Sequence, residues 1–366
     1  MTRIYIAGTS VCEPKTNPTL QHLFAVGWKL HSFFHCKEEK GLEMKWFDMN
    51  KENKVCLFLD SGAFSAWTQG VEINIQEYIQ FCLEHLDIVD VIANLDVIPG
   101  RPYQRLTQKD IDDSAMQGWI NYKKMRNAGI PREKLVHIFH QGEDMKWLRR
   151  MVKEMPYIGL SPANDKTTAQ KVMWLDSCME HVTDKDGMPI VKFHGFAVTS
   201  LRLMLRYPWY SVDSTSWVVT GRLGSIYVPR FRDGEWIYDE NSWKISVSNR
   251  SPGTKEAGKH INTLSPRQRQ TILDYIDAKG YKLGKSRFEK VPQSHQLADN
   301  ERWAEKKPKD KSAKRLLEII EEPGLCNMYQ LRDEINIIYF QDLEKHLPEW
   351  PWPFKRKGAK GFVLST

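Results

Sequence analysis

The sequence predicts an α/β fold in which parallel strands close into a (β/α)8, or TIM, barrel. Short apolar runs alternate with stretches of helical spacing at least six times along the chain, and polar residues repeatedly follow the apolar runs. Alternation of this kind is typical of parallel sheets with helical crossovers. The 366 residues are also enough for a barrel of about 250 residues with an appendage. A doubly wound open sheet is the alternative.

The predicted strands are short and apolar, and most of them end at a polar residue. They cover residues 3–8, 55–59, 89–96, 135–140, 157–160, 190–193 and 209–212. Residues 225–228 are a candidate eighth strand, and this number of strands favours a closed barrel over an open sheet. Residues 20–50 show neither the strand pattern nor the helix pattern and are interpreted as irregular.

Helices are predicted between these strands, where apolar residues recur every three or four positions. They cover residues 73–86, 109–128, 145–155, 167–182 and 200–206. Gly129 follows the second of them, and Pro156 and Pro208 follow the third and the fifth. Glycine and proline at these places are typical of helix ends.

The pattern changes after Gly221. Two short β-type runs on either side of Asp233-Gly234 predict a hairpin, because this dipeptide favours a tight turn. Further helices are predicted over residues 265–278, 316–319 and 328–347. We therefore expect two domains: a barrel over residues 1–280 with a hairpin insertion near 225–248, and a basic, helical C-terminal extension over 281–366.

The composition is that of a soluble globular protein, with 41% hydrophobic and 27% charged residues. No apolar run approaches the ~20 residues of a membrane span, so we expect no membrane partner. The first residues lack the apolar segment and cleavage site of a signal peptide. Six cysteines without paired spacing indicate reduced thiols in a cytoplasmic protein, not a disulfide framework or a compact zinc site.

Positive charge is concentrated towards the C-terminus. The net charge is +7, and residues 281–315 hold eleven Lys or Arg against five Asp or Glu, an excess of +6. Such an excess favours nucleic acid as a partner, and a solvated linker is the alternative. The candidate nucleic-acid contacts are Lys306, Lys307, Lys309, Lys311, Lys314 and Arg315.

Five short motifs lie at the ends of predicted strands. They are DSGAF at residues 60–64, HQGE at 140–143, YIGLS at 157–161, HGF at 194–196 and SVDS at 211–214. In kind and order these motifs resemble the tRNA-guanine transglycosylase superfamily. Within it the chain is most similar to the DpdA-type enzymes, which insert 7-deazaguanine bases into DNA in bacteria and their phages. The resemblance covers about residues 55–220.

The resemblance implies a reaction in which guanine in DNA is exchanged for a free 7-deazaguanine base. It assigns Asp213 as the nucleophile of a double displacement through a covalent aspartyl-nucleotide intermediate, and Asp60 as the general acid and base. Two carboxylates suit these roles when their surroundings push their pKa values apart. For both aspartates, capping of the helix that follows the strand is the alternative interpretation.

The same resemblance implies a pocket for the base. Asp96 would accept the N1–H and 2-amino groups, Gln141 would donate to the O6 carbonyl, and Phe64 would stack on the ring. The other predicted pocket residues are Ser61, Gly159, Leu160, His194 and Gly195. Turn formation is the alternative role for Asp96 and Gln141, and burial in the core is the alternative for His194.

Two departures from the superfamily pattern leave other functions open. The tRNA enzymes carry a Cys-rich zinc site after the barrel, whereas this chain has only Cys326 there, so we expect neither a metal nor another cofactor. Ser65 replaces a glutamine that usually follows the phenylalanine. The alternatives are a tRNA-directed transglycosylase without zinc, a non-catalytic nucleic-acid-binding barrel, and a glycoside hydrolase with two carboxylates. The preferred interpretation places the protein in the cytoplasm of a bacterium or of a phage-infected host.

Overall fold

The computed structural model describes residues 2–8, 22–23, 26–37, 41–53, 55–100, 104, 106–198, 200–251, 256–310 and 312–355. The chain forms two compact units, of which unit 1 comprises residues 1–215 with 344–366, and unit 2 comprises residues 216–343. The boundary expected at residue 280 therefore falls inside unit 2, and residues 216–280 belong with the chain that follows them.

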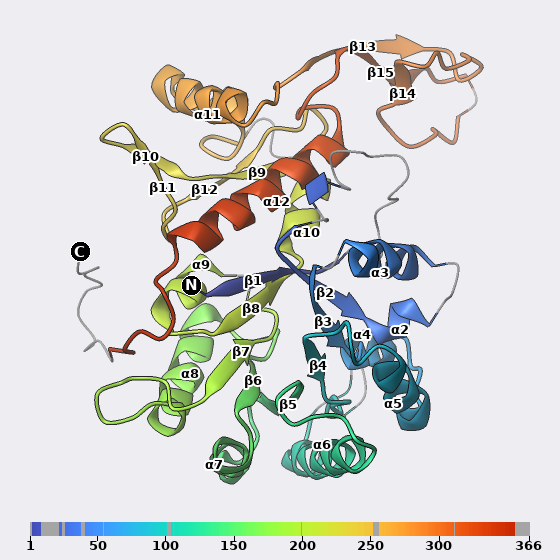
Figure 1. Ribbon diagram of the computed structural model, residues 1–366. Coiled ribbons are helices and arrows are strands. Elements are labelled where there is room, and N and C mark those ends of the chain that lie inside the picture. Colours follow the sequence, from blue (N-terminus) through green and yellow to red (C-terminus); the bar gives the residue numbers. More distant parts are fainter. Residues whose placement is uncertain are drawn as a thin grey trace. The chain divides into compact units, whose positions relative to one another are not determined.

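Unit 1 contains a closed barrel of parallel strands that neighbour one another in chain order (Figure 1). The strands are β1 (Arg3–Ile6), β2 (Trp28–Ser32), β3 (Cys56–Asp60), β4 (Val91–Ala93), β5 (Leu135–His140), β6 (Tyr157–Ser161), β7 (Lys192–Gly195) and β8 (Ser211–Ser214). The first and last strands pair in parallel, with Tyr5 opposite Asp213. The predicted (β/α)8 barrel is thus confirmed.

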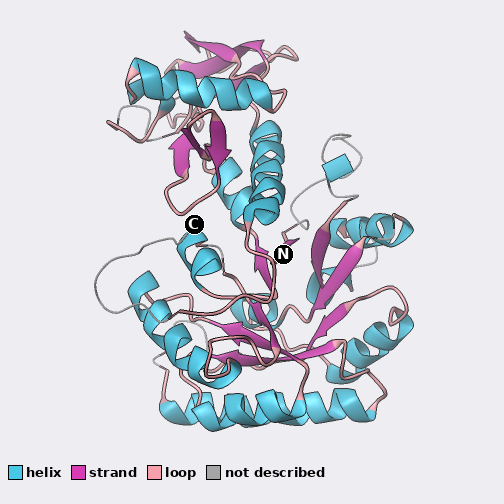
Figure 2. Cartoon of the chain, turned by 60° about the vertical axis from the view of Figure 1, so that its left-hand side comes forward, coloured by secondary structure: helices cyan, strands magenta, loops and turns pink. Residues whose placement is uncertain are grey.

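Helices follow the barrel strands and surround them, as Figure 2 shows. They are α2 (Phe33–Cys36), α3 (Leu42–Glu52), α4 (Ala63–Thr68), α5 (Ile75–Glu84), α6 (Gln108–Asn127), α7 (Met145–Glu154), α8 (Thr168–Val182) and α9 (Leu201–Arg206). Thr107 and Thr167 begin α6 and α8 with complete capping boxes. Asn74 and Asp144 cap α5 and α7 through their side chains, so these helix starts are specified locally.

One barrel strand differs from the prediction. Residues 28–32 form β2, although residues 20–50 were expected to be irregular. The candidate eighth strand, β9 (Ser225–Val228), lies in unit 2 and pairs antiparallel with β12 (Trp243–Ser246). The expected number of strands was therefore right, but the last of them was assigned to the wrong segment.

Buried polar side chains explain why β2 was missed. Lys29 and His31 alternate with Leu30 along the strand and are fully enclosed. His31 bonds Glu43 Oε1 through Nδ1 at 2.7 Å and the Asn50 amide through Nε2 at 2.8 Å, and both partners lie on α3. The Val26 carbonyl accepts from Lys29 Nζ. Because the polar groups of both residues have partners, β2 is buried without the apolar run by which strands are recognised.

The barrel interior is filled by every second residue of the strands, as the alternation of side chains in a strand requires. This cluster consists of Tyr5, Ala7, Leu30, Phe58, Val91, Ala93, Val136, Ile138 and Tyr157. Tyr5 meets Phe58 edge to face, with ring centroids 5.2 Å apart. Side chains therefore close the barrel from within, and the space for a ligand lies at its ends.

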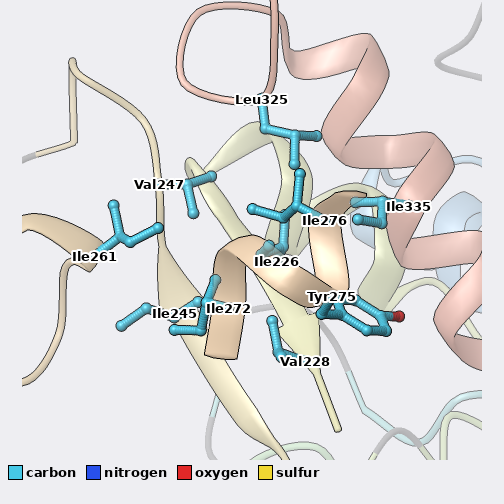
Figure 3. Packing of buried hydrophobic residues seen from close by; sticks show 10 residues of the cluster. All are labelled: Ile226, Val228, Ile245, Val247, Ile261, Ile272, Tyr275, Ile276, Leu325 and Ile335. Carbon is cyan, nitrogen blue, oxygen red and sulfur yellow. The ribbon is translucent and has the colours of Figure 1, made fainter. Parts of the chain in front are cut away.

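Unit 2 has its own core, formed by apolar residues of its strands and helices (Figure 3). Its further elements are α10 (Ser216–Arg222), β10 (Arg230–Arg232), β11 (Glu235–Ile237), η4 (Ile261–Thr263), α11 (Pro266–Ala278), β13 (Lys285–Val291), β14 (Glu301–Trp303), β15 (Arg315–Glu322) and α12 (Tyr329–His346), whose last three residues belong to unit 1. The predicted hairpin is confirmed as β10 and β11, with Asp233 and Gly234 at φ angles of 53° and 87°. Positive φ at both residues is what a tight hairpin turn requires.

The predicted helix over residues 316–319 is wrong, since this segment is part of β15. That strand lies between β13 and β14 in a three-stranded antiparallel sheet. A run of four apolar and charged residues is too short for its periodicity to separate strand from helix, and pairing with two neighbours decides the outcome. The helix predicted over residues 328–347 is confirmed as α12.

Two glycines allow a test of how closely β2 and β3 pack at their ends. Gly62 has a φ of +78°, and a Cβ there would overlap Ser32 Oγ and Phe34 Cβ; Gly70 has a φ of +66° and open space around it. We expect Gly70→Ala to lower the free energy of unfolding by about 1 kcal/mol, which is the backbone term alone. Gly62→Ala should lower it by about 3 kcal/mol, because the neighbouring chain must also move. Equal losses in urea denaturation would contradict this packing.

Candidate active site

A cavity of about 500 Å³ lies at the carboxyl ends of the barrel strands. Each strand contributes a lining residue at its carboxyl end or within three residues of it. In strand order these residues are Ala7, Ser32, Asp60, Asp96, His140, Ser161, Ala197 and Asp213. This is the end at which (β/α)8 enzymes carry their active sites.

Four of the residues predicted from the sequence line this cavity together: Asp60, Asp96, Asp213 and Phe64. They come from segments spread over about half of the chain, and closure of the barrel brings them to one place. The Phe64 side chain is 50% exposed and stacks on Trp67, with ring centroids 5.8 Å apart. The cavity thus combines these three aspartates with a fourth carboxylate, that of Glu43, and with an aromatic face that a flat ligand can reach.

The Asp213 carboxylate is held in place through one oxygen. Its Oδ1 accepts hydrogen bonds from the Ala197 backbone N–H at 2.7 Å and from His194 Nε2 at 3.3 Å. Its Oδ2 accepts none from a described residue, and 12% of the side chain is exposed. Asp213 is therefore oriented by one oxygen and has the other available for a substrate.

A buried chain of hydrogen bonds fixes the tautomer of His194. Tyr157 Oη lies 2.5 Å from Ser211 Oγ, which lies 2.6 Å from His194 Nδ1. Burial lowers the pKa of His194, and Asp213 only partly opposes this, so the ring is neutral at pH 7. Because the Asp213 carboxylate can only accept, the neutral ring carries its hydrogen on Nε2 and donates it to Asp213, and Nδ1 accepts from Ser211. His194 thus positions Asp213, and it does not line the cavity.

The environment of Asp60 favours the protonated form of its carboxyl group. Its Oδ2 accepts the Gly62 backbone N–H at 2.9 Å. Burial, followed by the nearby charge of Asp96 and then that of Asp213, raises the pKa of the Asp60 carboxyl from 3.8 to about 7. Near neutral pH this group can both give and take a proton.

Asp96 belongs to a hydrogen-bonded row of charged groups. Its Oδ2 lies 3.0 Å from His140 Nε2, and His140 Nδ1 lies 2.9 Å from Glu143 Oε1. Burial lowers the pKa of His140, but the hydrogen bonds to the two carboxylates outweigh it and raise the pKa to about 10. Ser61 Oγ donates to Asp96 Oδ1 at 3.3 Å. A permanent imidazolium therefore backs Asp96, which keeps acceptor capacity for donors of a ligand.

Several predicted pocket residues lie outside the cavity. Gln141 donates to the Gln170 carbonyl at 3.4 Å and accepts the Ala163 N–H at 3.1 Å, so its amide ties two loops together. Gly159 and Leu160 are buried within β6. Gly195 is buried in β7, where a Cβ would overlap Val198 and Trp209. These side chains and glycines shape the walls behind the cavity.

Sequence reasoning missed other residues that do line the cavity: His140, Ser161, Phe196 and Lys171. The alternation of side chains along a strand, with a period of two residues, would have identified His140 and Ser161. Val136 and Ile138 fill the barrel interior, so His140 shares their face and Gln141 does not. Lys171, on the first turn of α8, has no ion-pair partner among the residues that the structure describes.

The predicted nucleic-acid contacts lie in unit 2, around β14 and β15. Lys306, Lys307, Lys309 and Lys314 are exposed. Arg315 instead donates to the Glu305 carbonyl and covers the Trp303 ring at 4.5 Å. Lys311 lies outside the described residues. The four exposed lysines form a positive surface, and the structure gives them no particular ligand.

Within the described ranges, no group of three or more His, Cys, Asp or Glu side chains is placed to hold a metal ion. No described helix has both the length and the apolar character needed to cross a bilayer. Comparisons with protein-family models and with curated proteins gave no match for this chain.

The raised pKa of Asp60 predicts how the free energy of unfolding depends on pH. The folded protein keeps this proton up to about pH 7, whereas the unfolded chain releases it near pH 3.8. Between these pH values the folded state binds more protons, so the contribution of Asp60 to stability falls as the pH rises. One pKa unit corresponds to about 1.4 kcal/mol, and the folded and unfolded values differ by about three units, so we expect Asp60→Asn to be more stable than the wild type by up to about 4 kcal/mol near pH 8. Near pH 4 the gain should be small. Urea denaturation at both pH values measures this, and a gain independent of pH would contradict the assigned environment.

Proposed function

We propose that this protein is a transglycosylase that exchanges guanine in DNA for a 7-deazaguanine base. The observation that carries the proposal is the pair Asp60 and Asp213, two carboxylates in one cavity with opposite environments. Asp213 is held as an oriented acceptor, and the carboxyl of Asp60 has a pKa of about 7. A nucleophile and a proton shuttle need these two environments.

In the first displacement, Asp213 Oδ2 attacks C1′ of the target deoxyguanosine and the C1′–N9 bond breaks. The bonding electrons leave with guanine, and protonated Asp60 gives its proton to the departing base. The sugar is then joined to Asp213 as a glycosyl ester. The Ala197 N–H and His194 hold the other carboxylate oxygen throughout, so the nucleophile needs no reorientation.

In the second displacement, ionised Asp60 takes the N9 proton of the incoming 7-deazaguanine. N9 attacks C1′ from the face that guanine left, and the ester bond to Asp213 breaks. Both carboxylates return to their initial protonation states, so the exchange consumes no net proton and no oxidant. The sugar keeps its original configuration because it is inverted twice.

Recognition of the base is assigned to Asp96 and the aromatic rings. Asp96 accepts the N1–H and the 2-amino group, and the imidazolium of His140 behind it offsets its charge. Phe64 and Phe196 line the same cavity and offer faces for stacking. Gln141 is not available for the O6 carbonyl, and we assign its role to Lys171, which lines the cavity and carries a donor.

DNA is proposed as the acceptor because of the resemblance to the DpdA type and the absence of the Cys-rich zinc motif from the sequence. A stacked base in a duplex cannot reach a cavity at the end of a barrel. The target nucleotide must therefore be flipped out or lie in an opened strand. Transfer into tRNA is the competing outcome.

The test offers a labelled 7-deazaguanine base to the purified protein with duplex DNA, single-stranded DNA or tRNA. We expect label to enter DNA with the wild type and not with Asp213→Asn. Asp60→Asn should be slower by about 10²–10⁴-fold, as for other general acid–base groups. Asp165→Asn changes an exposed aspartate of the same unit and serves as the control.

Two outcomes would contradict the proposal. Undiminished exchange by Asp213→Asn would exclude its role as the nucleophile. If label enters tRNA but neither form of DNA, DNA is the wrong acceptor, and only the proposed displacement chemistry is retained.

A further inference from the structure

Unit 2 contains a second cavity, of about 480 Å³, whose lining is strongly basic. Four arginines line it, and each comes from a different part of the unit: Arg222 ends α10, Arg250 follows β12, Arg302 lies on β14 and Arg332 lies on α12. None of the described residues that line this arginine cavity is acidic. The fold therefore gathers separated positive charges around one space.

Nearby carboxylates neutralise only part of this charge. Glu318 is buried and lies 2.9 Å from Arg302 Nε. Asp333 lies near Arg222 and Arg332, and its burial raises its pKa to about 7. Against these two carboxylates alone, the four guanidinium groups have an excess charge of +2 even when both carboxylates are ionised. An anion in the cavity would balance that charge.

Arg332 is built into the cavity as a fixed donor. Its side chain is buried, and it donates from Nε to the Gly221 carbonyl and from Nη1 to the Leu325 carbonyl, both at 2.6 Å. Burial, together with the charge of Arg302, lowers its pKa to about 10, so it remains charged at neutral pH. Two of its five N–H groups are used, which leaves three for a ligand.

Arg222 and Arg250 are exposed at the same cavity. The Arg222 guanidinium lies over the Tyr329 ring, 4.9 Å from its centroid, and Tyr329 is 40% exposed. The Arg250 guanidinium has no partner among the residues that the structure describes. The cavity thus offers a free cation and an accessible aromatic ring next to the fixed donors.

We propose that the arginine cavity binds the phosphate group of a nucleotide, with the base lying against Tyr329. Guanidinium groups bind phosphate oxygens through paired hydrogen bonds, which explains arginine in place of lysine here. The phosphate can belong to a nucleic-acid strand or to a free nucleotide, which share this chemistry. The proposal does not depend on base exchange in unit 1.

The probe is fluorescein-labelled oligothymidylate, which contains no guanine and so offers unit 1 no base to exchange. Binding to the full chain is measured by fluorescence anisotropy over a range of salt concentrations. The test variant is Arg222→Gln/Arg250→Gln, because both side chains are exposed and Arg332 remains beside the buried Asp333. Arg302 is left intact because its loss would leave Glu318 unpaired inside the protein. The control is Arg267→Gln/Arg269→Gln, which removes the same charge from exposed positions on α11.

If the phosphate belongs to a strand, the test variant should bind at least about tenfold more weakly than the wild type. The slope of log affinity against log salt should fall by about 0.7 for each phosphate that the variant no longer neutralises, and the control should change neither quantity to this extent. If the phosphate belongs to a free nucleotide, labelled ADP should bind the wild type and lose binding in the test variant, while oligothymidylate binding stays unchanged. Unchanged binding of both probes, or an equal loss in the control, would overturn the proposal. Thermal unfolding of all variants checks that the fold is intact.

Discussion

Closure of the barrel between β1 and β8 is the constraint on which the candidate site depends. Tyr5 pairs in register with Asp213, and the strands are further joined by the Arg3 N–H to the Tyr210 carbonyl at 3.2 Å and the Ala7 N–H to the Ser214 carbonyl at 3.1 Å. These hydrogen bonds join segments about two hundred residues apart in the sequence. Without them, Asp213 would not face the strand ends that carry Asp60 and Asp96.

Carboxylates lie close together in the cavity where the chemistry is proposed, which is electrostatically unfavourable. Four carboxylates line one cavity, those of Glu43 and three aspartates, and the surroundings of the three aspartates differ. The negative charge of Asp96 is balanced by the His140 imidazolium, and Asp213 is held by a backbone N–H and a neutral imidazole. The pKa of Asp60 is raised by burial and by the neighbouring aspartates. Perturbed carboxylates of this kind tend to lie at functional sites, because stability alone would favour neutral side chains there.

The sequence revealed the fold class and the aspartates because both depend on local pattern. Apolar runs that end in carboxylates are visible without a structure, and they located Asp60, Asp96 and Asp213. The strand β2 was hidden because partners on α3 make it possible to bury His31, and the Val26 carbonyl accepts a hydrogen bond from the buried Lys29. Gln141 was predicted as a pocket residue in place of His140, because the two-residue alternation of side chains was not applied as far as His140, the last residue of β5. The arginine cavity could not be predicted, since its four arginines lie far apart in the sequence and meet only after unit 2 folds.

The most direct test of the central claim is to identify the atom that carries the sugar during exchange. Wild-type protein would be mixed with guanine-containing DNA, quenched in acid, digested with nuclease and protease, and mapped by mass spectrometry. We expect a nucleotide attached to the peptide that contains Asp213, and no such adduct in Asp213→Asn. A nucleotide attached to Asp60, or base exchange that proceeds without any adduct, would contradict it.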